Sequence, residues 1–324
     1  MYMKRMNIEP FREFWQDCFN CIVYSLTEFS QDVPKLYYYN NMYRYNYTEE
    51  TVKENGIKYR SLVPWTDNFR LLDELTHNLE KKKLAECENP IQYVKEKIDE
   101  GKIILLAIDL FHWIKEGLHY MNNHIIHMSL VIGYDDDAKQ LIVFETGDEG
   151  YLEHRVDYEQ AEKAIKAAHI STRVSEINPA VKVKMYNKEN LVFYAKQIIE
   201  SIDEKIENEH DIWKVEGLSD EGLNEVLSII QTHIYSMQNR AYINAYMFEN
   251  AFENDLIEGV SLHEKFHEME KDYERLKGVC IKAVYRKNKY QEIMNVKNKM
   301  LSMLETEKDL WNHYIKHVDK MRIK

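Results

Sequence analysis

Cysteine is scarce in this chain, which has four among its 324 residues: Cys18, Cys21, Cys87 and Cys280. So few and so widely spaced cysteines exclude a disulfide framework, and a reducing cytoplasm is the expected compartment. The sequence also lacks the run of about 18 apolar residues that a transmembrane helix needs. Its first residues, MYMKRMNIEPFREFW, include basic side chains but no apolar core of a signal peptide. We therefore expect a cytoplasmic protein with no membrane partner.

Positive charge is also in short supply. Lys and Arg number 43 against 55 Asp and Glu, which gives a formal net charge of -12. General nucleic-acid binders need basic surface to displace counterions from phosphate groups. The charge balance therefore argues against a nucleic-acid partner, although it is compatible with a local basic patch.

Glycine and proline are rare in the second half of the chain, which has helical periodicity from about Asn187 onward. Apolar residues at helical spacing predict four helices at about 188–209, 219–254, 260–287 and 289–320. The break VEGLSDEG has helix-capping chemistry, because the Ser219 hydroxyl can accept from backbone N–H groups. Such helices pack as a bundle or as antiparallel hairpins. We expect an all-helical domain over residues 187–324.

Residues 1–186 mix helical and strand patterns, which predicts an α+β domain. Helical spacing occurs in DCFNCIVYSLTEF, over residues 67–86, in NPIQYVKEKIDEG and in YEQAEKAIKAAH. KIILLAIDLF is typical of a buried strand, and HMSLVIGYDDDAKQLIVFET is typical of two strands joined by an Asp-rich turn. The tyrosine-rich segment from Tyr37 to Tyr47 fits either the lining of a pocket or a half-buried loop.

The stretch DCFNC, residues 17–21, has two cysteines three positions apart at the start of an apolar run. A redox pair with this spacing normally follows a strand in a βαβ pattern, but the upstream NIEPFREFWQ is a poor strand. The spacing also fits half of a zinc site, but the chain has no second close pair of Cys or His ligands. The redox and zinc interpretations are therefore both weak.

A helical reading gives the two cysteines different roles. Cys18, Cys21 and Ile22 fall on one face, and Cys21 is typical of a small core residue. Cys18 follows Asp17, a candidate N-cap, on the first turn. There the helix dipole and unpaired backbone N–H groups favour a thiolate, and one N–H can face a developing oxyanion. On spacing alone, however, a Cys in an apolar run is more often a buried, inert thiol.

A thiolate nucleophile needs a base and a group that orients the base. His127 begins the first strand of the predicted hairpin and Glu145 ends the second, so the two can face each other across the strands. His124 would point to the opposite face, because side chains alternate along a strand. His112 and His119 lie on the less regular approach to the hairpin and are more typical of surface or packing residues.

Together these segments resemble a known family. The DC at a helix start, IDEGKIILLAIDLF and HMSLVIGYDDDAKQLIVFE resemble the C39-like branch of the papain-like cysteine peptidase fold over about residues 10–155. With its helical second half, the chain resembles more narrowly the family of the butirosin biosynthesis protein H and the cysteine-protease homologues of closthioamide-type pathways. The resemblance implies an amide-forming acyltransferase of antibiotic or other specialised-metabolite biosynthesis. Its donor would be the phosphopantetheine thioester of a carrier protein and its acceptor a small amine, with no bound cofactor or metal.

The resemblance also implies roles for particular residues. It makes Cys18 the nucleophile, His127 the base and Glu145 the third catalytic residue. These families more often have Asp or Asn in the third position, so Asp148 and Thr146 are alternatives.

The oxyanion position departs further from the family pattern. Papain-like enzymes place a Gln upstream of the Cys, where this chain has Arg12. Gln16 and Asn20 are substitutes chosen for their proximity to Cys18, and Gln16 is the residue we assign.

Other functions remain open. The same triad would serve a hydrolase, either a peptidase or a thioesterase, because one fold hosts several chemistries. In a non-catalytic binding protein, the helical half would be an interaction module. Asp135, Asp136 and Asp137 can be read as a calcium site, but three carboxylates in a turn are more often solvated. Basic segments for docking an acidic carrier protein are KEKIDEGK and Arg286 to Lys299, although charge runs are more often solvated helix faces.

Overall fold

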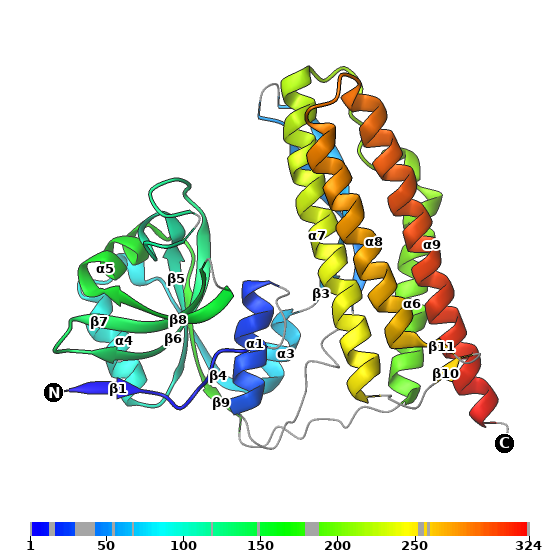
Figure 1. The fold of residues 1–324 in the computed structure, drawn as a ribbon. Coiled ribbons are helices and arrows are strands. Elements are labelled where there is room, and N and C mark those ends of the chain that lie inside the picture. The colour runs from blue at the N-terminus through cyan, green and yellow to red at the C-terminus, as the bar shows by residue number, and fades with distance from the viewer. Residues whose placement is uncertain are drawn as a thin grey trace. The chain divides into compact units, whose positions relative to one another are not determined.

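The computed structural model describes residues 2–12, 17–29, 43–53, 56–66, 68–117, 119–147, 150–178, 188–251, 256–257 and 260–322. The chain divides into two compact units, whose elements are labelled in Figure 1. The first, the sheet unit, combines Met1–Tyr37 with Asn68–Lys184. The second, the helical unit, combines Tyr38–Asp67 with Met185–Lys324. Among the described residues, no helix is long and apolar enough to cross a membrane.

The described part of the sheet unit contains a seven-stranded sheet. Its strand order is β4–β9–β5–β6–β7–β8, β1 pairs with β6, and every pairing is antiparallel. The strands are β1 (Met3–Arg5), β4 (Thr76–Lys82), β5 (Ile103–Asp109), β6 (Ile126–Asp135), β7 (Gln140–Gly147), β8 (Gly150–Asp157) and β9 (Thr172–Ile177). The α+β prediction for this region is confirmed, as are the hairpin, now β6 and β7, and the buried strand, now β5.

Helices cover both faces of this sheet (Figure 1). On one face, α4 (Pro90–Asp99) and α5 (Tyr158–Ala167) cover a core cluster that includes Leu106 and Val143. On the other face, α1 (Cys18–Phe29) lies against β6 and β7. Because both faces are covered, every residue of β5 is buried, which explains an apolar run without polar alternation. The described part of this unit also contains α3 (Asn68–Leu75) and the short 3-10 helices η1 (Leu84–Glu86) and η2 (Leu110–His112).

The helix predicted over residues 67–86 is wrong. α3 ends at Leu75, and the chain continues as β4, an edge strand paired with β9. Leu72 and Leu75 are buried at the end of the helix, whereas Leu79, the one large apolar side chain of β4 after Thr76, is 41% exposed. A longer helix would bury almost nothing more. Pairing with β9 satisfies the backbone and leaves the lysines of β4 on an exposed edge, where they discourage further strand pairing.

The GY pair of the hairpin has a structural explanation. β1 passes so close to Gly133 that an added Cβ would lie 2.3 Å from the carbonyl oxygen of Lys4. The next residue, Tyr134, is buried, and its hydroxyl donates to Asp99 of α4 at 2.9 Å. Because Gly133 has no side chain, β1 can pair with β6 at this point, and the Tyr134 hydrogen bond holds α4 against the sheet.

The four helices predicted for the second half are confirmed: α6 (Lys188–Glu207), α7 (Asp220–Ala251), α8 (Leu262–Ala283) and α9 (Lys289–Arg322). The Ser219 hydroxyl caps α7 by accepting from the Gly222 N–H at 3.2 Å. Ser261 caps α8 in the same way, through the Glu264 N–H at 3.3 Å. The described residues of this unit also form η3 (Glu209–Asp211) and two short paired strands, β10 (Leu256–Ile257) and β11 (Val260–Ser261).

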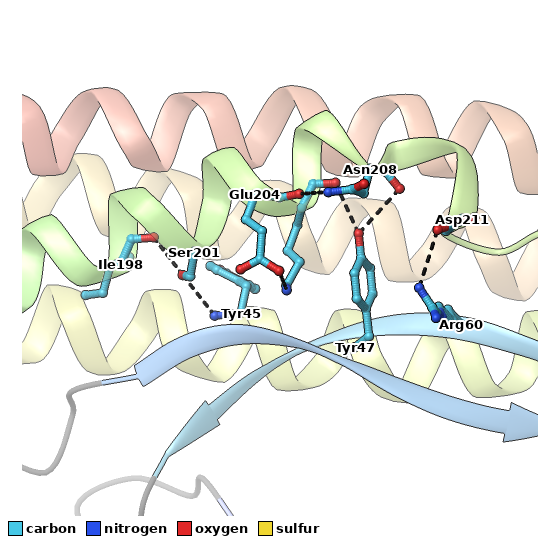
Figure 2. Close-up of polar contacts among 9 residues, drawn as sticks. Tyr45, Tyr47, Arg60, Ile198, Ser201, Glu204, Asn208 and Asp211 are labelled. Atoms are coloured by element: carbon cyan, nitrogen blue, oxygen red, sulfur yellow. Dashed lines mark hydrogen bonds and ion pairs between the residues drawn. The ribbon is translucent and has the colours of Figure 1, made fainter.

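The helical unit also contains residues that we expected in the first domain: β2 (Tyr43–Thr51), which pairs with β3 (Lys58–Thr66) as a hairpin. The Tyr45 hydroxyl donates to the buried Glu307 carboxylate of α9 at 2.6 Å, and its N–H donates to Ser201 of α6 at 3.1 Å. Figure 2 shows the Tyr47 side chain directed from the hairpin toward Asn208 after α6, and the Tyr45 backbone N bonded to Ser201 of α6. The unit is therefore not all-helical, and the sheet unit is not continuous in sequence, because tertiary contacts of these tyrosines outweigh sequence proximity.

These contacts give Tyr43 and Tyr45 a packing role. The Tyr43 hydroxyl also contacts Glu307, and it accepts from Asn244 at 2.9 Å. Both rings are buried within the helical unit. Tyr37, Tyr38 and Tyr39, which belonged to the same predicted cluster, lie outside the described residues.

A second polar chain holds β3 against α7. The Trp213 indole N–H donates to Ser61 Oγ at 2.9 Å, and Ser61 Oγ contacts His233 Nδ1. His233 Nε2 lies 3.3 Å from the Glu50 carboxylate. Burial lowers the pKa of His233 to about 4, so its ring is neutral at pH 7 and Nδ1 can accept from Ser61. Ser61 is fully buried, so this serine–histidine–glutamate chain has a structural role and no access for a substrate.

Replacing Ser61 by Ala should lower the free energy of unfolding by about 1–3 kcal/mol, because the substitution leaves the Trp213 N–H and His233 Nδ1 without partners. Urea denaturation followed by circular dichroism measures this loss. Ser228→Ala, at an exposed position of α7, is the control and should cost less than about 0.5 kcal/mol. Equal, small losses in the two variants would contradict the role of the chain.

Candidate cysteine–histidine–glutamate site

The Cys18 thiol occupies the first turn of α1, as predicted. Asp17 is the N-cap, because its carboxylate accepts from the Asn20 N–H at 2.8 Å. Cys21 is fully buried, whereas Cys18 is partly exposed. Cys18 is therefore the thiol that a substrate can reach, and Cys21 is a core residue.

Two paired strands bring His127 and Glu145 to this thiol. His127 lies near the start of β6 and Glu145 near the end of β7. His127 Nε2 is 3.5 Å from Glu145 Oε1. The Cys18 sulfur, one ring nitrogen of His127 and one carboxylate oxygen of Glu145 all lie within 4.8 Å of one another. The structure thus brings together the three residues that the sequence singled out.

Strand β7 supplies two consecutive residues to the site. The Glu145 carboxylate folds back so that Oε1 accepts from the Thr146 N–H at 3.0 Å. The Thr146 hydroxyl lies 3.2 Å from Cys18 Sγ. Glu145 therefore contacts the imidazole, while Thr146 contacts the thiol. Asp148, the other alternative for the third position, lies outside the described residues.

The surroundings of His127 favour its protonated form. Burial acts to lower its pKa, but hydrogen bonds to Cys18 and Glu145 and the negative charges of both groups raise the pKa to about 10. The imidazole therefore keeps its proton at pH 7. A protonated histidine beside a thiol favours the thiolate, which is the nucleophilic form of cysteine.

This raised pKa also links the site to stability. The folded state holds the His127 proton more tightly than the unfolded chain, whose ordinary pKa is 6.5. The stabilising contribution is therefore fully present below about pH 6.5, and it is lost as the pH rises through about 10.

The predicted oxyanion residues contribute less. Gln16 lies outside the described residues. Arg12 is exposed, and Asn20 is fully buried with its side-chain amide donating to Asp17, so Asn20 belongs to the helix cap. The oxyanion donor that remains is the backbone N–H of Cys18. The first N–H groups of a helix have no acceptor within the helix, so this N–H can face a developing oxyanion.

His124 belongs to a separate pair. Its Nδ1 lies 2.6 Å from the buried carboxylate of Asp109, and its ring stacks on Phe111 at a centroid distance of 4.2 Å. The His124 side chain is 66% exposed. The His112 ring packs edge-on against Phe111, with a distance of 4.8 Å between the ring centroids. These histidines therefore form a surface cluster, and His127 is the one that meets Cys18.

One neighbour of the site was missed from the sequence. Tyr151 of β8 lies opposite Thr146 in the β7–β8 pairing, in which Gly147 pairs with Gly150. The signal was present, because GDEG between two strand-like runs is a turn pattern that fixes this pairing.

Cys, His and Glu side chains can also hold a metal ion. In zinc sites the ligand atoms lie about 2.0–2.3 Å from the metal, so the 4.8 Å spread found here would have to tighten around zinc. Within the described residues, this is the one group of three such side chains.

The Asp-rich turn does not form such a group among the described residues. The Asp135 carboxylate closes the turn by accepting from the Asp137 N–H at 3.1 Å. Asp136 accepts from Lys95 at 2.6 Å and from the Tyr158 hydroxyl at 2.9 Å. Turn and packing contacts therefore account for Asp135 and Asp136 better than a calcium ion does.

Neither a protein-family model nor a curated protein matches this chain. The chemistry of the site and the resemblance carried by the sequence motifs are therefore what indicate a function.

Replacing His127 by Ala should slow alkylation of Cys18 by iodoacetamide about 10-fold or more at neutral pH, because the thiolate loses its cationic partner. The variant and wild-type rates should converge above about pH 10, where His127 itself loses its proton. Peptide-resolved mass spectrometry measures the rate at Cys18 alone.

His124→Ala is the matched control and should leave the Cys18 rate unchanged. An equal loss in both variants would mean that the surface histidine pair, rather than His127, controls the thiol.

Proposed function

We propose that this protein is a cysteine-dependent acyltransferase that forms amides, taking its acyl group from the phosphopantetheine thioester of a carrier protein. The observation that carries the proposal is the meeting of the Cys18 thiol with His127 and Glu145 within 4.8 Å. Thiol, imidazole and carboxylate are the nucleophile, base and orienting acid of an acyl-enzyme mechanism.

The chemistry proceeds in two transfers. The Cys18 thiolate attacks the thioester carbonyl, and the pantetheine thiolate leaves and takes the proton from His127. An amine then attacks the acyl-Cys18 thioester, its proton passes to the neutral His127, and Cys18 leaves as a thiolate. Glu145 keeps the imidazole directed toward the thiol, because its Oε1 lies 3.5 Å from Nε2 and is fixed by the Thr146 N–H.

A thiol suits this sequence of steps. Exchange of an acyl group between two thiols is nearly isoenergetic, whereas amide formation is downhill, so the acyl-enzyme forms reversibly and the amine drives the reaction. Such an enzyme must keep water from the acyl-enzyme.

The arrangement of elements supports a papain-like fold as part of this proposal. A helix with cysteine at its first residue lies against an antiparallel sheet, and neighbouring strands of that sheet carry the base and the acid. The resemblance to the butirosin biosynthesis protein H family adds the carrier-bound donor, the amine acceptor and a place in specialised-metabolite biosynthesis.

A basic surface is expected for an acidic carrier protein. Within KEKIDEGK each lysine pairs with a neighbouring acid: Lys95–Asp136, Lys97–Glu100 and Lys102–Glu176. Between Arg286 and Lys299, Lys289 is buried against Asp220, but Arg286 and Lys287 are exposed. The segment from Arg286 to Lys299 is therefore the better docking candidate.

Two other functions share the site. A hydrolase would use the same first transfer, with water in place of the amine. A zinc-binding protein would use Cys18, His127 and Glu145 as ligands instead of forming an acyl-enzyme, and their 4.8 Å spread would first have to tighten around the ion.

Mixing the protein with short acyl-pantetheine thioesters should add one acyl group to Cys18, because thioester exchange with this thiolate needs no further activation. Intact-mass spectrometry measures the adduct. It should be absent in Cys18→Ala and retained in Cys21→Ala, since Cys21 is a core residue.

The fate of the adduct separates the functions. Faster discharge by added amines than by water supports the transferase, and rapid loss to water supports the hydrolase. Equal loss of the adduct in Cys18→Ala and Cys21→Ala, or stoichiometric zinc in the purified protein that blocks acylation, would contradict the proposal.

A further inference from the structure

Tyr151 stands beside the candidate site. It lies on β8 directly opposite Thr146, whose hydroxyl is 3.2 Å from Cys18 Sγ. Directly opposed residues in an antiparallel pair project from the same face of the sheet, close to each other. The Tyr151 ring also packs edge-on against Phe144, two residues before Thr146, at a centroid distance of 5.9 Å. Tyr151 is thus held on the face of β7 that Cys18 approaches.

The Tyr151 hydroxyl is buried without a partner. The residue is 5% exposed, and across the part of the chain that the structure describes its hydroxyl oxygen has no hydrogen-bond partner. A buried hydroxyl left unpaired carries a free-energy penalty, and native proteins keep few such groups. A phenylalanine would fill the same space without that penalty, so packing alone does not explain the hydroxyl.

Negative charge lies close to this hydroxyl. Burial raises the pKa of Tyr151 well above its usual value, and the charges of Glu145, Cys21 and Cys18 raise it further. The hydroxyl therefore keeps its proton at neutral pH. It can act toward a nearby anion only as a hydrogen-bond donor.

We propose that the Tyr151 hydroxyl is a donor reserved for the Cys18 thiolate, and that it acts beside Thr146 when the thiol loses its proton. This inference rests on the proposed nucleophilic role of Cys18. The one proton that moves passes from Cys18 to His127, and Tyr151 retains its own. Tyr151 is then a positioning residue. Its hydrogen bond to the Cys18 thiolate increases the fraction of Cys18 that is deprotonated at neutral pH.

The Thr146 contact explains why a second donor is useful. Its hydroxyl can donate a single hydrogen bond to the sulfur, while the imidazolium of His127 is shared with Glu145 at 3.5 Å. A thiolate accepts several hydrogen bonds, and donors to a charged acceptor contribute more than donors to a neutral one.

The test is Tyr151→Phe, which keeps the ring and its contact with Phe144. Alkylation of Cys18 by iodoacetamide is followed by peptide-resolved mass spectrometry from about pH 5 to pH 10. We expect the variant to react about 10-fold more slowly near neutral pH, with its pH profile shifted upward and the rates converging at high pH. Its melting temperature should be unchanged or higher, because the unpaired hydroxyl is gone.

Tyr158→Phe is the matched control. The Tyr158 hydroxyl donates to Asp136 at 2.9 Å, in the turn that follows the end of β6 opposite to His127. This variant should leave the Cys18 profile unchanged.

Two results would overturn the inference. Unchanged alkylation in Tyr151→Phe would show that the hydroxyl does not serve the thiolate, and a rate lowered equally at every pH together with a lower melting temperature would show a role in packing. The assay contains no acyl donor. A shifted profile in a protein that forms no acyl adduct would therefore refute the acyltransferase while leaving the role of Tyr151 intact.

Discussion

The antiparallel pairing of β6 with β7 is the constraint on which the candidate site depends. His127 and Glu145 meet because one begins the first strand and the other ends the second. A slip of one residue would exchange the faces of every side chain on a strand and separate them. The register is held by the apolar faces of both strands, each packed beneath helices, and by Gly133, where β1 joins at the bulge in the pairing.

Local patterns were enough to predict much of this. The turn between β6 and β7 is short, so strand alternation placed His127 near Glu145 without knowledge of the rest of the sheet. Cys18 was placed on a first turn because Asp17 is a capping residue and the following residues have helical spacing. In the second half of the chain, apolar residues recur at helical spacing over long segments. This spacing was enough to predict that these segments are helices and roughly where they end.

Long-range contacts account for what the sequence did not reveal. β4 forms because β9, about a hundred positions later, offers an unpaired edge. The hairpin of β2 and β3 joins the helical unit because Tyr45 finds its acceptor on Glu307. Thr146 was considered only as an alternative to Glu145 in the third position, since no sequence pattern shows that its hydroxyl contacts Cys18 while its backbone N–H donates to Glu145.

Some buried polar atoms at the candidate site have no hydrogen-bond partner among the described residues. Among the described residues, buried atoms that lack a hydrogen bond include Glu145 Oε2 and the Tyr151 hydroxyl, whereas His127 Nε2 lies 3.5 Å from Glu145 Oε1. The helical unit has such atoms as well, for example the Tyr59 hydroxyl and Asn224 Oδ1, whereas its Ser61 is held between Trp213 and His233. Incomplete hydrogen bonding reduces stability, and it leaves groups free to respond when charge develops on a reacting atom.

The assignment of residues 38–67 to the helical unit also governs the order in which the protein can be completed during synthesis. The chain passes from one unit to the other after Tyr37, after Asp67 and again after Lys184. The hairpin therefore leaves the ribosome long before α6 to α9 exist, and Tyr43 and Tyr45 stay without their buried acceptor until Glu307 has been translated. Neither unit corresponds to one uninterrupted stretch of the gene, so a fragment cut at a single point would leave these rings exposed to solvent and to other chains.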